Sequence, residues 1–457
     1  VGLNFRGEYD INKWIKVTED FRWGTGKSKG ANTSSDQSGV ILMAVNMPSS
    51  AVVRYDDGTW GGTTTDDPEY IAQYGSNFAS IHSDCINPVH QLYRDNPYNV
   101  SSNVMSTTGL EFANLVKGLK FNSRFTYYLN TGFSRNFSTM RPEIGKPEIS
   151  NSLSYSASVG TGWKTENTLN YDNTFGKHSV GALLSTTSNY DTGRGFSASA
   201  ATFADESDAM AYFNFANDYR TPSDYLSGPD ANVAFVARGS YSFDDRYFFT
   251  ASWRRDIAGR LPDGHNYGDF PAVTGAWKVS SEPFFPKTDA VTLLKIRSSF
   301  GRVGNLGSIG WNYKSNTLGS GGWGNQQAQY GLEQGAGHVG TFYFMTKALN
   351  PNLTWETSEQ FDLGLDAAFL KDRLEFTADF YNKRTFNLIQ GQTSGWPDSI
   401  GMSAMLINQG EIMNRGIELM AGWNDKIGDW SYFVNGNAAY NKNGVSDIGV
   451  LNSDGTK

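Results

Sequence analysis

The feature of this sequence that most restricts its fold is a repeated alternation of apolar and polar side chains with a period of two. In residues 360–369, the apolar members are Phe361, Leu363, Leu365, Ala367 and Phe369, and the residues between them include Asp362, Gly364 and Asp366. After a short polar turn at 370–373, the alternation resumes at Leu374, Phe376, Ala378 and Phe380. Because successive side chains of a strand point to opposite faces, the two runs predict a β-hairpin with one apolar face.

The same pattern recurs along most of the chain. The clearest further pairs are residues 110–116 with 119–130, 233–243 with 247–254 and 417–423 with 430–441, and weaker pairs are 3–9 with 14–23, 161–172 with 177–190 and 270–281 with 291–303. The pattern predicts an all-β chain of about seven hairpins, or about fourteen strands, each of about nine to eleven residues.

The connections between these predicted strands alternate strictly in length. The short ones fall near residues 10–13, 116–118, 173–176, 244–245, 282–290, 370–373 and 425–429, and the long ones are 24–102, 131–160, 191–232, 256–269, 304–357 and 385–410. A soluble sandwich or propeller has no reason to keep all its long loops at one end. An outer-membrane barrel has short periplasmic turns and long extracellular loops, so the alternation favours a transmembrane antiparallel up-and-down β-barrel.

Aromatic residues stand at the ends of the apolar faces, as Tyr247 with Trp253 and Trp430 with Tyr440 do. Such rings favour the two headgroup layers of a membrane. For any single residue, the general preference of aromatics for strands is an equally good explanation. The repetition over several hairpins favours the membrane interpretation.

The overall composition excludes several classes of protein. The chain of 457 residues contains 50 glycines, only 18% charged residues and a net charge of -8, with no basic tract, so an α-helical enzyme and a nucleic-acid partner are both disfavoured. The mean hydropathy is -0.46. No apolar run approaches the roughly 18 to 20 residues of a transmembrane helix. Cys85 is the only cysteine, so an intrachain disulfide is impossible. The alternation begins at Leu3 without a signal peptide, and we therefore expect the numbering to start inside a longer gene product.

The sequence carries no motif that predicts catalysis, a metal site or a cofactor. The histidines are scattered through loops and turns, at His82, His90, His178, His265 and His338. None has a second histidine four residues away or a nearby cysteine. Acidic pairs such as Asp56-Asp57 and Asp205-Glu206 are typical of solvated loops, and neither a G-x-S-x-G elbow nor a P-loop occurs. We therefore expect a protein that is not an enzyme.

The aromatic residues of the long loops are the candidates for binding. They are Trp60, Trp311, Tyr313, Trp323 and Trp396, and they stand among Gly, Asn, Gln and Ser. Rings that stack on sugar faces and amides that bond hydroxyls suit a substrate- or partner-binding surface. Packing of one loop on another, or docking on a partner protein, is an equally good explanation for each residue taken singly.

Several stretches of the chain resemble one family. Residues 350–366 read NPNLTWETSEQFDLGLD and residues 374–384 read LEFTADFYNKR, while residues 245–256 read DRYFFTASWRRD and residues 410–418 read GEIMNRGIE. Together with Phe270-Pro271, Ala276-Trp277 and residues 440–443, these resemble the SusC-like TonB-dependent transporters of the outer membrane. The similarity is strong over residues 233–448 and looser before them.

The resemblance implies a 22-stranded barrel that is closed by an N-terminal plug. It further implies a SusD-like surface lipoprotein as a lid, contact with the TonB complex through the plug region, and an oligosaccharide or peptide substrate. The plug, its TonB box and the last strands of the family find no match here. We therefore expect residues 1–457 to be a barrel section of about fourteen strands without a plug domain, surrounded by outer-membrane lipid.

The predicted function is import of a bulky polar nutrient across the outer membrane of a Gram-negative bacterium, with an oligosaccharide favoured. The polar face would line the lumen, with Arg124, Arg254, Asp362, Asp366, Glu375 and Asp379 on it. Two alternatives stay open at this point. One is a complete fourteen-stranded passive channel, and the other is a soluble or surface-attached β-protein that binds or cleaves glycans.

Overall fold

The structure is a computed structural model, and it describes most of the chain. The described residues are 1–30, 32–33, 39–47, 51–61, 86–94, 97–141, 148–220, 222–310, 313–314, 318–320, 329–331, 339–341, 343–345, 348–392 and 405–448.

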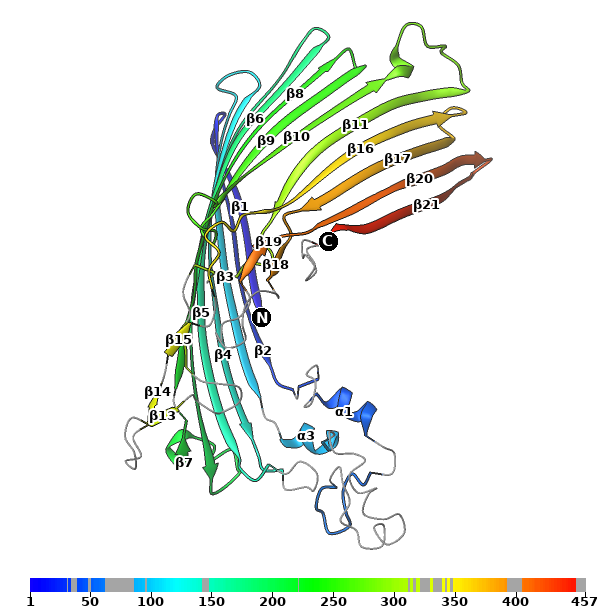
Figure 1. Ribbon diagram of the computed structural model, residues 1–457. Coiled ribbons are helices and arrows are strands. Elements are labelled where there is room, and N and C mark those ends of the chain that lie inside the picture. The colour runs from blue at the N-terminus through cyan, green and yellow to red at the C-terminus, as the bar shows by residue number, and fades with distance from the viewer. Residues whose placement is uncertain are drawn as a thin grey trace, which may run out of the picture.

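One large antiparallel sheet dominates the molecule (Figure 1). Its main path follows the sequence from end to end: β1 (Gly2–Asn12), β2 (Ile15–Ser28), β3 (Tyr98–Ala113), β4 (Leu119–Ser138), β5 (Ser152–Phe175), β6 (His178–Phe203), β8 (Ser223–Phe243), β9 (Tyr247–Ala258), β10 (Tyr267–Lys278), β11 (Val291–Asn305), β16 (Glu356–Phe369), β17 (Leu374–Phe386), β20 (Glu411–Ile427) and β21 (Trp430–Asp447). Each strand therefore pairs with its neighbour in sequence, and the all-β, antiparallel up-and-down fold class is confirmed.

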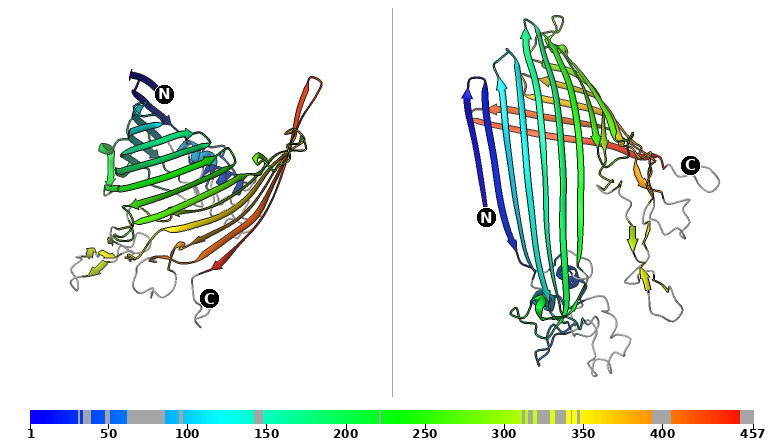
Figure 2. Two further views of the ribbon diagram at one scale, coloured as in Figure 1. Left: turned by 90° about the horizontal axis from the view of Figure 1, so that it is seen from above. Right: turned by 90° about the vertical axis from the view of Figure 1, so that its left-hand side faces the viewer.

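The sheet is strongly curved and open, as the two further views show (Figure 2). Among the described residues, β1 pairs only with β2 and β21 pairs only with β20, so these two strands form the edges of the sheet. The concave side of the curve is one face of a single layer of strands. No second layer of described strands covers either face along the main path.

The two faces of the layer differ in chemistry because the register keeps like residues together. Phe361 of β16 lies opposite Phe300 of β11, and Leu363 lies opposite Phe380 of β17. Phe361 is 41% exposed and Leu363 is 47% exposed, although both are large and apolar. A face of this kind needs an apolar environment to cover it.

The short and long connections lie at opposite ends of the strands (Figure 1). The long connections carry the smaller elements, which are α1 (Val40–Asn46), α3 (Pro88–Arg94), η2 (Phe213–Phe215), β7 (Ala216–Tyr219), β12 (Leu318–Ser320) with β15 (Tyr343–Met345), β13 (Gln329–Gly331) with β14 (Val339–Thr341), and β18 (Ile389–Gly391) with β19 (Leu406–Asn408). The short connection between β10 and β11 carries η3 (Val279–Ser281). None of the described helices is long and apolar enough to span a membrane.

The expected strand length of about nine to eleven residues is wrong. The main strands have 11 residues in β1 and up to 26 in β6, so the long connections are shorter than expected. The physical reason is visible between β5 and β6, where Ser154 pairs with Ser199 and Ser156 pairs with Ser197. Serine and glycine fill one face here, and the other face mixes alanine with a few large residues such as Tyr155 and Phe196, so the alternation is weak, but the backbone hydrogen bonds of the ladder continue.

Two packed cores lie where the ends of the strands meet the long connections. One cluster includes Phe137, Leu153 and Phe203 of β4, β5 and β6, and a second includes Leu261, Ile309 and Leu353 of the connections. Both lie at the end of the sheet that carries the long connections, so the loops there have apolar interiors that anchor them to the strands.

Candidate functional site

The concave, polar face of the sheet is the candidate functional surface. The six residues predicted to line a lumen all lie on the polar face, on the other side of the sheet from Phe361 and Leu363. Their partners on a neighbouring strand are Gly109 for Arg124, Phe270 for Arg254, Ser299 for Asp362, Lys295 for Asp366, Gly422 for Glu375 and Glu418 for Asp379. The alternation of the sequence thus brings charged groups from distant parts of the chain onto one wall.

Ion pairs hold many of these charges in place. The guanidinium of Arg297 in β11 lies 2.7 Å from Asp379 and 3.2 Å from Asp366. Arg297 can lie flat there because Gly364 pairs with it, and a Cβ on Gly364 would come within 2.6 Å of the guanidinium carbon. A guanidinium between two carboxylates has its hydrogen bonds satisfied without a ligand, so the ion pairs fix the shape of this part of the wall.

Three hollows follow this face from one end of the strands to the other. The hollow at the short-turn end has a volume of about 620 Å³, the middle hollow beside Arg297 about 300 Å³, and the hollow at the long-connection end about 520 Å³. The face therefore carries a series of open depressions that are lined by both polar and apolar groups.

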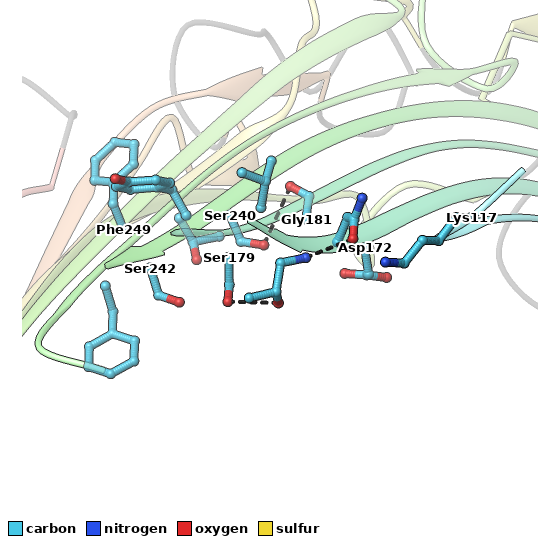
Figure 3. A pocket seen from close by; sticks show the side chains of 13 residues that line it. Lys117, Asp172, Ser179, Gly181, Ser240, Ser242 and Phe249 are labelled. Carbon is cyan, nitrogen blue, oxygen red and sulfur yellow. Dashed lines mark hydrogen bonds between the residues drawn. The ribbon is translucent and has the colours of Figure 1, made fainter. Parts of the chain in front are cut away.

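Hydroxyl groups dominate the hollow at the short-turn end, which Figure 3 shows. Ser179 and Ser242 lie on adjacent strands beside Gly181, and Ser240 donates a hydrogen bond of 3.4 Å to the Gly181 carbonyl. Asp172 and Lys117 complete the lining on one side. These groups are suited to water and hydroxyls, and the hollow contains both hydrogen-bond donors and acceptors.

The hollow at the long-connection end was not predicted from the sequence. Its charged residues are Asp191 in β6, Asp230 in β8 and Arg260 in the connection between β9 and β10, which are far apart in the chain. Arg260 donates to a carboxylate oxygen of Asp230 at 3.3 Å and to the Ile309 carbonyl at 2.9 Å. The glycines at positions 160, 162 and 193 could have indicated a hollow, because they leave side chains out of the wall. The pattern of alternating apolar residues does not include them.

A buried acidic residue organises the turns at the other end. Glu282 accepts hydrogen bonds from Arg246 at 2.9 Å and from the Trp277 indole at 3.0 Å. Hydrogen bonds from Tyr247, Trp277 and Arg246 lower the pKa of Glu282 below its ordinary value. This cluster joins the turn after β8 to the connection between β10 and β11.

The predicted loop aromatics fall into two groups. Trp311, Trp323 and Trp396 lie outside the described residues. Trp60 stacks on His90 with ring centroids 4.6 Å apart and contacts the guanidinium of Arg54 at 5.0 Å. Trp60 thus packs within its own long connection, against α3.

Tyr313 is only 4% exposed and lies in the loop core with Leu261, Ile309 and Leu353. Its hydroxyl accepts a hydrogen bond from the backbone N–H of Asn350 at 2.8 Å, and burial raises the pKa of Tyr313. In both described residues, the ring takes part in the packing of loops, which was the alternative that the sequence left open. Trp60 and Tyr313 are also not brought together.

Within the described part of the chain, no group of three His, Cys, Asp or Glu residues is placed to hold a metal ion.

Comparison with known proteins gives consistent matches. A family model described as TonB dependent receptor-like, beta-barrel matches residues 44–457. The chain is 28% identical to TonB-dependent receptor P3 of Formosa agariphila over 432 residues, which are 90% of this chain and 38% of that protein. It is also 28% identical to TonB-dependent receptor SusC of Bacteroides thetaiotaomicron over 221 residues, which are 47% of this chain and 21% of that protein.

Among solved structures, the RagAB peptide transporter matches with a TM-score of 0.77 and 19% identity, over 98% of this chain and 47% of that one. This likeness concerns the fold. The chain spans less than half the length of each of these relatives.

Proposed function

Because the chain belongs to the TonB-dependent receptor-like β-barrel family, we propose that it forms part of the wall of a transporter in the outer membrane of a Gram-negative bacterium. The transporter imports a bulky polar nutrient, and an oligosaccharide is the favoured substrate. The observation that carries this proposal is the single-layered sheet, with large apolar side chains exposed on one face and charges and hydroxyls on the other.

Transport through such a wall requires gating and no bond chemistry. Ion pairs such as Arg297 with Asp379 neutralise fixed charges of the wall. A hydrated solute can therefore pass along the wall without binding tightly to a single charged group. Serine hydroxyls in the hollow of Figure 3 offer exchangeable hydrogen bonds. A polyhydroxylated solute can replace water at each of these positions at little cost in free energy.

We further propose that residues 1–457 are a section of a 22-stranded barrel, whose plug and TonB contact belong to the rest of the transporter. The open edges at β1 and β21 support this proposal. A SusD-like lipoprotein would cover the end that carries the long connections, where Trp60, Trp311, Tyr313, Trp323 and Trp396 stay candidates for contact with substrate or partner. Of the two that are described, Trp60 is the less buried.

The proposal is tested on the native complex, extracted in detergent from its source membrane. We expect intact-mass measurement to find a chain much longer than 50.3 kDa together with a lipoprotein. We also expect whole cells to take up oligosaccharide only while TonB is present. A soluble species near 50.3 kDa without a partner would refute the transporter and favour a glycan-binding protein. Uptake that persists without TonB would instead indicate a passive channel.

A further inference from the structure

The hollow at the long-connection end of the concave face has a floor made of glycines. Gly160 of β5 pairs with Gly193 of β6, and Gly162 pairs with Asp191. Asn130 of β4 lies opposite Gly160 on the other side. Where side chains would otherwise stand up from the wall, these positions leave a depression of about 520 Å³.

A ring and a carboxylate lie side by side over this floor. A Cβ placed on Gly162 would come within 2.4 Å of the Tyr128 ring and within 2.6 Å of an Asp191 carboxylate oxygen. Glycine at position 162 is therefore what allows Tyr128 and Asp191 to approach each other. The flat face of a tyrosine ring can pack against the C–H face of a pyranose, and the oxygens of a carboxylate can accept hydrogen bonds from its hydroxyls.

The two carboxylates of the hollow, Asp191 and Asp230, differ in how many of their oxygens already accept hydrogen bonds or ion pairs from the protein. Asp230, which lies opposite Asp191 in the register, is paired with Arg260. Within the described residues, Asp191 accepts a side-chain hydrogen bond of 3.0 Å from Asn189 and makes no ion pair. A carboxylate has about four acceptor positions, so Asp191 retains capacity for donors from a ligand.

The hollow also offers donors, which decides the class of ligand. The guanidinium of Arg260 and the amide of Asn130 line it together with the acceptors. Arg260 is already paired with Asp230, so the groups that face a ligand are the carboxylate of Asp191 and the amide of Asn130. A sugar hydroxyl both donates and accepts hydrogen bonds, so it can use both groups.

We propose that this hollow is a sugar subsite, in which Tyr128 lies against one pyranose ring of an oligosaccharide and Asp191 and Asn130 bind its hydroxyls. This inference rests on the proposed function and places a substrate contact on the wall itself, at the end that carries the long connections. Arg260 and Asp230 hold each other at the rim, and the glycine floor allows the ring to approach the backbone.

The test uses the complete transporter with its partner, purified in detergent, and titrates it calorimetrically with two neutral hexasaccharides, maltohexaose and laminarihexaose, and with a lysine-rich hexapeptide. For a hexasaccharide that binds, we expect Asp191→Asn and Tyr128→Ala each to weaken binding on the order of tenfold. We expect Gly160→Val to abolish binding by filling the hollow, because the nearest atom to a Cβ there is 4.0 Å away and the fold can accept it.

Asp20→Asn is the matched control, because it makes the same change on the polar face of β2, outside the three hollows. We expect it to bind like the wild type. Wild-type affinity in all three test variants, with normal thermal unfolding, would overturn the sugar subsite while the transporter stands. Loss of peptide binding and not of sugar binding in Asp191→Asn would also overturn it. Failure of the wild type to bind or import either hexasaccharide would remove the favoured substrate, and the subsite with it.

Discussion

At the scale of single residues, the two faces of the sheet set opposite rules for charge. On the concave face, Arg297 lies between Asp366 and Asp379 within hydrogen-bonding distance of both. The preceding residue of β11, Ile296, lies opposite Leu365 on the face that we assign to lipid. The same substitution should therefore have very different effects at neighbouring positions.

Leu365→Arg and Thr377→Arg form a matched pair on the two faces. Leu365 belongs to the apolar face, and Thr377 of β17 lies opposite Asp366 on the polar face. We expect Leu365→Arg to lower the free energy of unfolding by about 2 to 4 kcal/mol if it lies near the bilayer midplane, because hydrocarbon solvates the cation poorly. We expect Thr377→Arg to cost much less. Urea unfolding of the barrel in lipid vesicles measures both, and equal costs would contradict a lipid-facing stripe.

Glu19 is an exception on the apolar face. It lies in β2 between Val17 and Phe21, and its two carboxylate oxygens accept hydrogen bonds of 2.6 Å from Ser106 and from Thr108. We expect Ser106→Ala to destabilise the protein by about 1 to 3 kcal/mol, because a carboxylate in an apolar setting loses a donor.

The same Ser106→Ala change should cost almost nothing in a Glu19→Leu background, where no carboxylate needs the hydroxyl. A double-mutant cycle in lipid vesicles measures this coupling. Additive effects of the two substitutions would mean that Glu19 is solvated by something other than these hydroxyls.

At the scale of elements, the sequence predicts hairpins better than it predicts their ends. The expected pair 360–369 and 374–381 corresponds to β16 and β17, since each strand keeps strict alternation between its turn and its aromatic end. Residues 191–203 of β6 were expected in a loop because glycine, serine and alanine are frequent there and weaken the contrast between the two faces. Only pairing with β5 and β8 makes them a strand, and pairing partners cannot be identified from one local pattern.

The candidate site shows the same limit. The charged residues of the concave wall follow from the alternation, because the period alone assigns Asp362 and Asp379 to the polar face. The hollow over Gly162 depends on the register between β4, β5 and β6, which places Tyr128 and Asp191 together from positions far apart in sequence. Long-range register of this kind is fixed by the assembled sheet.

The turn cluster at Glu282 gives a prediction for pH dependence. The pKa of Glu282 is lowered in the folded protein by donors from Tyr247, Trp277 and Arg246. The ionised form therefore stabilises the fold above the ordinary glutamate pKa, and this contribution is lost as the pH falls through the lowered folded value. We expect Glu282→Gln to lower the thermal unfolding midpoint at pH 7.

We also expect the difference between Glu282→Gln and the wild type to shrink as the pH is taken below the ordinary glutamate pKa of about 4.3. Thermal scans across this range in detergent provide the measurement. Glu359→Gln is the control, since Glu359 pairs with Arg302 and Arg384 at the opposite end of the strands and does not touch the turn cluster. A pH-independent difference for Glu282→Gln would mean that the residue acts through packing.

At the scale of the whole molecule, the two edge strands of the sheet, β1 and β21, each leave one side of their backbone without a paired strand among the described residues. Among the described residues, the backbone of β1 is paired on the side of β2 only, and that of β21 on the side of β20 only. In hydrocarbon, each unpaired N–H and C=O group costs several kcal/mol. A membrane-embedded sheet of this kind therefore requires further strands at both edges or direct closure of β1 on β21.

Hydrogen exchange of the intact protein in detergent distinguishes these arrangements. We expect the amides of β1 and β21 to exchange as slowly as those of β5, which is paired on both sides, because the proposed 22-stranded barrel would pair both edges with further strands. Residues 1–457 produced alone should exchange rapidly along both edges and associate through them. If this fragment were monomeric and equally protected, β1 would be paired with β21 in a closed fourteen-stranded channel, and the proposal of a barrel section would be wrong.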